Sequence, residues 1–96
     1  MEIFRTFRIH SSRFLPNLKK DHICSKMHGH TFNISIHANA NIDDKTGFVM
    51  DFYDIDLIFK KNIHLIIDHK ILNDIKGLEN PTSENLSIWI WNKIKS

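Results

Sequence analysis

Two histidines separated by one residue, with a cysteine shortly before them, are the side chains of this sequence that point most directly to chemistry. His28 and His30 flank Gly29, and Cys24 lies four residues before the first histidine. Side chains at positions i and i+2 of a β-strand point to the same face, so both imidazoles can bind one transition metal. Strand histidines that only hydrogen-bond to neighbours share this spacing. We interpret the segment as a metal site beside a reactive thiol.

The composition predicts one small domain that spans residues 1–96. A chain of this length has little core, so oligomerisation is a natural way to cover its remaining apolar surface. The 13 Lys and Arg residues against 11 Asp and Glu give a net charge of only +2, and the basic residues are scattered, which disfavours nucleic-acid binding. One cysteine, no signal-peptide pattern and no apolar run of membrane-spanning length indicate a cytoplasmic protein that does not enter a membrane.

Two strands are predicted in the first half of the chain. Residues 3–10 and 28–40 alternate between apolar and polar types, and the two histidines share the parity of Phe32 in the second strand. Residues 12–27, between the strands, show no periodicity. Connections this long in a small domain are usually functional.

Two helices are predicted in the second half. One begins at Asp51, and its apolar residues recur at helical spacing: Phe52, Ile55, Phe59, Ile63 and Ile66. The other has Thr82 or Ser83 as its cap and Glu84 in its first turn. Its apolar stripe consists of Leu86, Trp89, Ile90 and Ile94. A two-stranded sheet is marginal alone, so another chain completes it or this chain is shorter than its fold.

Four motifs resemble the family of 6-pyruvoyl-tetrahydropterin and 6-carboxytetrahydropterin synthases. They are CSKMHGHT at residues 24–31, TGFVMDF at 46–52, DHKILN at 68–73 and NPTSEN at 80–85. The motifs occur in the family's order and span nearly the whole chain. The spacing from Cys24 to His28, and the run at residues 77–82, look more like the bacterial 6-carboxytetrahydropterin branch.

The resemblance implies an α+β protein with the tunnelling fold. In that fold, two helices are inserted between the second and third strands of a four-stranded antiparallel sheet, and trimers pair into hexamers with active sites between subunits. The predicted order of elements matches the first two thirds of this fold. The resemblance therefore implies a chain that lacks the last two strands and the glutamate that holds the pterin ring on the last of them.

The resemblance also assigns roles to particular residues. Cys24 is implied as the general base, and Asp68 orients His69 for proton exchange. Thr82 and Glu84 are implied to lie near the pterin pocket, although both also suit the capping of a helix. These roles describe a binding site for a small-molecule pterin triphosphate.

The resemblance implies a zinc cofactor bound by His28 and His30, but the third ligand departs from the family pattern. Arg13 stands where family members usually carry a third zinc-binding histidine, and a guanidinium stays protonated and cannot bind zinc. His10 would have to reach the site through a bulge, and His22 from the loop. We expect zinc to bind weakly unless one of them moves in.

The function implied is that of a lyase which converts 7,8-dihydroneopterin triphosphate to 6-carboxytetrahydropterin, with release of acetaldehyde and triphosphate, in queuosine precursor biosynthesis. One alternative is 6-pyruvoyl-tetrahydropterin synthase, which eliminates triphosphate without cleaving the side chain. Another is a catalytically silent protein that binds metal or pterin.

Overall fold

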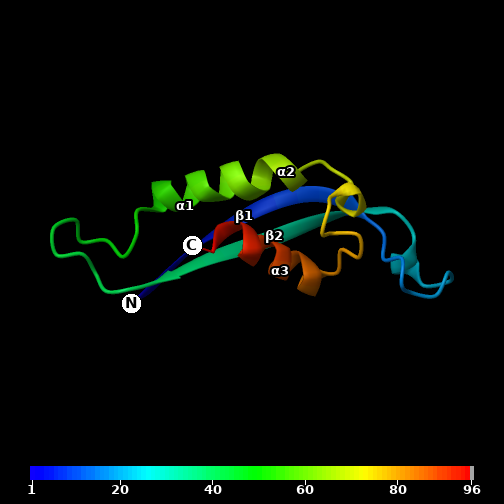
Figure 1. The fold of residues 1–96 in the computed structure, drawn as a ribbon, viewed down its shortest axis with the longest axis horizontal. Helices are drawn as coiled ribbons and strands as arrows, with labels where there is room; N and C mark the ends of the chain where they lie inside the picture. Colours follow the sequence, from blue (N-terminus) through cyan, green and yellow to red (C-terminus); the bar gives the residue numbers. More distant parts are fainter. Residues whose placement is uncertain (96) are drawn as a thin grey trace.

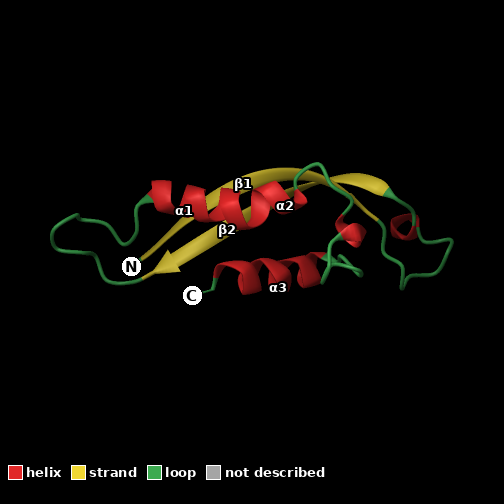
Figure 2. Ribbon diagram, turned by 45° about the horizontal axis from the view of Figure 1, so that its top comes forward, coloured by secondary structure: helices red, strands yellow, loops and turns green. Residues whose placement is uncertain are grey.

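Two long antiparallel strands run through the molecule, and helices cover one face of the sheet that they form (Figures 1 and 2). The computed structural model describes residues 1–95, which extend over 56 × 21 × 20 Å. In chain order the named elements are β1 (Glu2–Arg13), β2 (His28–Asn39), α1 (Phe52–Phe59), α2 (Leu65–Ile67) and α3 (Ser83–Ile94). No helix among residues 1–95 is long and apolar enough to cross a membrane.

The pairing of β1 with β2 fixes which side chains face the helices. Ile9 lies opposite Phe32, and both are buried in the core. The alternation predicted for both strands is present, but β1 continues to Arg13, beyond the predicted end at residue 10. The sequence hid this extension because the next two inward positions are occupied by polar residues, Ser11 and Arg13, which are buried all the same.

The helix predicted after Asp51 is confirmed, and the Asp51 side chain caps it by accepting a hydrogen bond from the Tyr53 amide at 2.9 Å. Its apolar stripe was predicted to end at Ile66, which is wrong: Ile66 is 36% exposed and Ile67 is fully buried. The segment Lys60–His64 between α1 and α2 is π-helical. A π turn contains one residue more than an α turn, so the residues that follow it are rotated about the helix axis. As a result, Ile67 rather than Ile66 faces the core.

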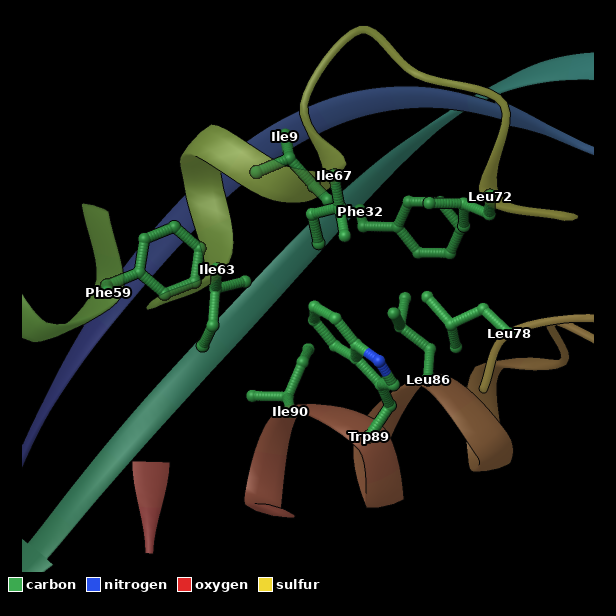
Figure 3. Close-up of a cluster of buried hydrophobic side chains, with 10 residues drawn as sticks. All are labelled: Ile9, Phe32, Phe59, Ile63, Ile67, Leu72, Leu78, Leu86, Trp89 and Ile90. Carbon is green, nitrogen blue, oxygen red and sulfur yellow. The ribbon is translucent and has the colours of Figure 1, made fainter. Parts of the chain in front are cut away.

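Both helices contribute to one hydrophobic core (Figure 3). The helix α1 packs on β1, where the rings of Phe7 and Phe59 stack with centroids 4.0 Å apart. Of the two possible caps of α3, Thr82 is the one used: its hydroxyl accepts from the Asn85 amide at 3.0 Å. The residues that close the core from α3 are Leu86, Trp89 and Ile90. Ile94 packs against its edge.

A short loop covers the outer edge of β1. The Ser12 amide donates to the Lys70 carbonyl at 2.9 Å, and the backbones of Ser12 and Ile71 form an isolated parallel bridge. Among residues 1–95, no strand pairs with the outer edge of β2. The outer edge of β1 is therefore covered at its C-terminal end, and the outer edge of β2 is open within residues 1–95.

Candidate functional site

The pair of histidines at the start of β2 extends from the helix-covered face of the sheet. The ring centroids of His28 and His30 lie 6.4 Å apart, and the His30 ring lies 4.5 Å from that of Phe32. The Nδ1 atom of His28 is 2.8 Å from the Lys26 carbonyl oxygen, which can only accept, so Nδ1 donates and Nε2 is left as an acceptor. Metal-binding histidines commonly hold their second ring nitrogen in this way.

Arg13 completes this cluster from the neighbouring strand. It lies opposite His28 in the sheet and is only 8% exposed. Its guanidinium sits 4.9 Å from the centroid of the Phe32 ring, and Nη1 donates to the Pro81 carbonyl at 2.9 Å. A fixed cation thus occupies the end of β1 and ties the segment before α3 to the sheet.

The positive charge of Arg13 acts on the imidazole of His30. Partial desolvation is the largest cause that lowers the pKa of His30 from its ordinary value of 6.5, and the charges of Arg13 and His28 lower it further. Although His30 as a residue is exposed, its ring lies against Phe32 and loses part of its hydration. The neutral imidazole is therefore favoured at His30.

The donor atoms of this cluster do not match a catalytic zinc site. Such sites normally take three protein ligands and leave one position open, and here the strand supplies two imidazoles beside a guanidinium. Within residues 1–95, no three His, Cys, Asp or Glu side chains are gathered in a way that would hold a metal ion. The residues present therefore do not fit zinc as a full resident cofactor.

Neither of the two histidines considered as replacement ligands joins the pair. The ring of His10 lies on the opposite face of β1, where Nδ1 is 3.0 Å from the Thr31 hydroxyl. The Nδ1 atom of His22 accepts a hydrogen bond from the Cys24 amide at 3.0 Å. Each side chain has a local partner of its own.

Asp68 and His69 form a hydrogen-bonded pair at the covered edge of β1. The Asp68 carboxylate accepts from Nδ1 of His69 at 2.8 Å, which leaves Nε2 of that ring as the atom able to exchange a proton. The pair is bound to a single residue of β1: the His10 amide donates to Asp68 Oδ1 at 2.9 Å, and the His69 amide donates to the His10 carbonyl at 2.6 Å.

These bonds hold His69 in an unusual backbone conformation. Its φ of 57° lies in the left-handed region, which costs a non-glycine residue about 1–2 kcal/mol. The conformation leaves the imidazole 75% exposed beside a carboxylate that is only 16% exposed. Strained residues that present a reactive group on a fixed backbone are typical of functional sites.

Hydrogen bonding keeps the Asp68 carboxylate ionised. The amide of His10 is the largest cause that lowers the pKa of Asp68 below its ordinary value of 3.8; His69 and His64 lower it further, and partial burial opposes them. An ionised Asp68 holds the proton of His69 on Nδ1. The carboxylate thus selects the imidazole tautomer.

Cys24 lies within a short 3-10 helix, Ile23–Ser25, in the long loop between the strands. Cys24 is a free cysteine, and it is partly buried. The Cys24 carbonyl accepts a hydrogen bond from the Leu15 amide at 2.9 Å, which joins the two sides of the loop. Cys24 is not among the described residues that line the cavity beside His69.

Thr82 and Glu84 lie at the start of α3. Thr82 caps the helix as described above, and Glu84 is exposed in the first turn. The Arg13 guanidinium approaches this region, with Nη1 3.5 Å from the Ser83 hydroxyl. The helix start therefore lies beside the cluster of Arg13, His28 and His30.

A cavity of about 480 Å³ joins the two groups of site residues. It is lined by His10, Thr31, His69 and Lys70, and also by His30 from the pair on β2. His30 also lines the groove between β2 and α3. His30 and its neighbour Thr31 are therefore common to the linings of the cavity and of the groove.

His10 was not recognised from the sequence as the anchor of the Asp68–His69 pair. It acts there through its peptide N–H and C=O, which every residue other than proline carries. No side-chain pattern reports such a contact. The contribution of Lys70 to the cavity was missed for a similar reason, since its place depends on how the loop folds onto β1.

Comparison with known proteins connects this arrangement to one family. Residues 2–96 match the family described as 6-pyruvoyl tetrahydropterin synthase. A 6-carboxy-5,6,7,8-tetrahydropterin synthase of Synechocystis is 31% identical over 97 residues, which cover 97% of this chain and 74% of the relative. The chain belongs to the 6-pyruvoyl tetrahydropterin synthase family. The family expected from the four sequence motifs is thereby confirmed.

Members of this family carry different names for their reactions. A dihydroneopterin monophosphate aldolase of Pyrococcus furiosus is 38% identical over 73 residues, which cover 73% of this chain and 57% of the relative. The chain thus spans between about half and three quarters of the length of these two relatives. Family membership supports a tetrahydropterin synthase type of lyase by resemblance, and the particular reaction requires a separate argument.

The fold is shared with a solved structure of the same family. The structure of Caenorhabditis elegans 6-pyruvoyl tetrahydropterin synthase aligns with a TM-score of 0.88 at 20% sequence identity, covering 99% of this chain and 76% of that one. This likeness confirms the predicted α+β fold class. The two strands and the helices of this chain are therefore part of the synthase fold.

Proposed function

We propose that this chain is a lyase that converts 7,8-dihydroneopterin triphosphate to 6-carboxytetrahydropterin, with release of acetaldehyde and triphosphate, in queuosine precursor biosynthesis. The observation that carries the proposal is the Asp68–His69 pair, whose carboxylate orients an exposed imidazole held on a strained backbone. Membership of a family named for pterin chemistry supplies the substrate class. We further propose that the protein works in the cytoplasm as a homo-oligomer.

The proposed mechanism assigns one task to each residue. Asp68 keeps the His69 proton on Nδ1, so that Nε2 of His69 accepts or returns a proton at the substrate side chain. Cys24 acts as the second acid–base group, and a neighbouring subunit supplies it to the cavity beside His69, whose lining residues within residues 1–95 do not include Cys24. Thr82 and Glu84, at the start of α3, bind the polar edge of the pterin. No step is assigned to zinc, whose ligand set is incomplete in this chain.

Product analysis tests the reaction. We expect the purified chain, incubated with 7,8-dihydroneopterin triphosphate, to yield 6-carboxytetrahydropterin and acetaldehyde by liquid chromatography and mass spectrometry. The variant His69→Ala should lose at least about 100-fold in rate, the usual size of an acid–base contribution. The variant His37→Ala, at an exposed histidine that pairs with Glu2, is the matched control and should keep the wild-type rate.

Two other reactions are outcomes of the same experiment. A product that retains the whole side chain after loss of triphosphate would assign the 6-pyruvoyl-tetrahydropterin reaction instead. Turnover of dihydroneopterin monophosphate alone would assign the aldolase reaction named for the Pyrococcus relative. Binding of pterin without any turnover would indicate a catalytically silent protein.

A further inference from the structure

The buried guanidinium of Arg13 has no negative partner among residues 1–95. Four ion pairs form among residues 1–95, and none includes Arg13. Removing a charge from water is strongly unfavourable unless the charge is paired. The Phe32 ring and the Pro81 carbonyl offset part of this cost, but neither carries a charge.

One N–H group of this guanidinium is also left unused. The Nε atom of Arg13 is the single buried side-chain nitrogen or oxygen among residues 1–95 that has no hydrogen-bond partner. Buried donors are nearly always paired in folded proteins, so a free one calls for an acceptor that the chain does not itself supply. Nε and the adjacent amino group of an arginine form the fork that binds carboxylates and phosphates with two hydrogen bonds.

The surroundings of Arg13 disfavour a metal cation for the same reasons that they favour an anion. His28 and His30 supply at most two ligands, and the fixed positive charge opposite His28 repels a dication in a weakly screened site. The His30 imidazole can instead donate a ring N–H to an anionic oxygen beside the guanidinium. Nε2 of His28 is left to accept from a protonated oxygen of the same ligand. Ser83 adds a hydroxyl 3.5 Å from Nη1.

We propose that Arg13, His28 and His30 form a metal-independent site that binds an anionic oxygen group, a carboxylate or a phosphate, through the Arg13 guanidinium. The charge that a bound metal ion would provide is supplied by the chain itself. The proposal concerns binding alone, so it stands or fails independently of the reaction proposed above.

Nuclear magnetic resonance of the arginine side chains tests anion binding without any substitution. The chain has three arginines, so its Nε–H spectrum contains three signals. Arg5 forms a two-point pair with Asp56, and Arg8 lies 3.4 Å from the Asn33 side chain, so both serve as internal controls. Titration with inorganic phosphate in one arm and acetate in the other should move the Arg13 signal with saturation and leave the controls in place.

The two arms identify the ligand chemistry. A saturating shift with phosphate alone assigns a phosphate group, and one with acetate alone assigns a carboxylate. A signal of Arg13 that stays unchanged in both arms, or moves only in parallel with those of Arg5 and Arg8, overturns the proposal.

Metal content tests the other half of the proposal. After dialysis against zinc, the natural chain should retain well below one zinc per chain by mass spectrometry of the metal. The variant Arg13→His should retain about one, because it supplies the third imidazole. Arg8→His places the same change on the opposite face of β1 and should leave the zinc content unchanged. A full, tightly held zinc in the natural chain contradicts the proposal, as does an Arg13→His variant that folds but gains no zinc.

Discussion

At the scale of single residues, two clusters use similar side chains in different ways. The Asp68–His69 pair combines an ionised carboxylate with an imidazole of fixed tautomer. The cluster at the start of β2 combines two imidazoles with a buried cation. The first arrangement is suited to the transfer of a proton, and the second to the binding of charge.

Replacing Asp68 by asparagine should separate these roles. In Asp68→Asn, the amide can donate to Nδ1 of His69 and so favour the other tautomer, which removes the free acceptor at Nε2. We expect turnover to fall by about 100-fold or more while pterin binding persists. Steady-state rates and equilibrium binding of the substrate measure the two effects. An unchanged rate would show that Asp68 does not orient His69.

The effect of Asp68→Asn on the free energy of unfolding should depend on pH. Because the pKa of Asp68 is lower in the folded chain than its ordinary value of 3.8, its carboxylate stabilises the fold above that pH. This stabilisation is lost as the pH falls through the folded pKa. Urea unfolding should therefore show the natural chain as more stable than Asp68→Asn at pH 7, with the difference shrinking below about pH 4. A difference that grows on acidification would contradict the account.

The role proposed for Cys24 depends on the chemistry of its thiol more than on packing. Its residue is partly buried in a short helix, and the backbone carbonyl makes the contact that fixes the loop. We expect Cys24→Ala to abolish turnover and to change the unfolding free energy by less than about 1 kcal/mol. Rates like those of the natural chain in this variant would exclude Cys24 as the base. Circular dichroism confirms that the variant is folded.

At the scale of elements, apolar periodicity predicted the strands and helices that contribute to the core. It missed features that depend on backbone geometry or on buried polar side chains. The parity of both strands, the stripe of α3 and the middle of the first helical stripe, Ile55 to Ile63, followed from apolar spacing and are present in the structure. Phe52, at the start of the predicted stripe, is 44% exposed and was wrongly expected in the core. The extension of β1 to Arg13 was missed because polar side chains occupy its inward positions. The shift from Ile66 to Ile67 was missed because a π turn leaves no side-chain signature.

Two neighbouring substitutions test the π turn. Ile67→Ala removes a fully buried side chain and should cost about 2–4 kcal/mol of unfolding free energy. Ile66→Ala, at the position that a regular helix would bury, should cost less than about 1 kcal/mol. Urea denaturation of both variants decides between the registers. Equal losses, or a larger loss for Ile66→Ala, would contradict the observed helix.

The site shows the same division between what side chains and backbone reveal. The motifs pointed to His28, His30, Cys24 and the Asp68–His69 pair as candidate site residues, because the chemistry expected of them lies in side chains. How the pair is attached to β1 could not be predicted, since that attachment uses the peptide group of His10. The burial of Arg13 was equally hidden, because it depends on Pro81, distant in the sequence.

At the scale of the whole molecule, the chain exposes more surface than its mass requires. Its accessible area is 6951 Å², against about 5,700 Å² expected for a compact monomer of 11.3 kDa. Part of this surface is the groove between β2 and α3, lined by Ile34, Ile36 and Trp91 beside the open edge of β2. An open strand edge favours pairing with further strands.

Supplying strands to that edge should therefore change the behaviour of the chain. We expect residues 1–96 alone to elute in size-exclusion chromatography as a mixture of oligomers and larger, irregular aggregates, with low activity. A hybrid in which two strands from a relative follow Ser96, including the glutamate that the family resemblance implies, should elute as a defined oligomer. A stable oligomer formed by residues 1–96 alone, with full activity, would show that the open edge needs no further strand.

The central claim is that Cys24 of one chain and the Asp68–His69 pair of another form a single catalytic site. Mixing the separately inactive variants Cys24→Ala and His69→Ala under conditions that exchange subunits tests it most directly. When the two variants are mixed in equal amounts, half of the chains keep Cys24 and the other half keep His69. About one quarter of the shared sites then contain both natural residues. We predict that the mixture recovers about that fraction of the natural rate of 6-carboxytetrahydropterin formation. A mixture that exchanges subunits and stays inactive would contradict the account.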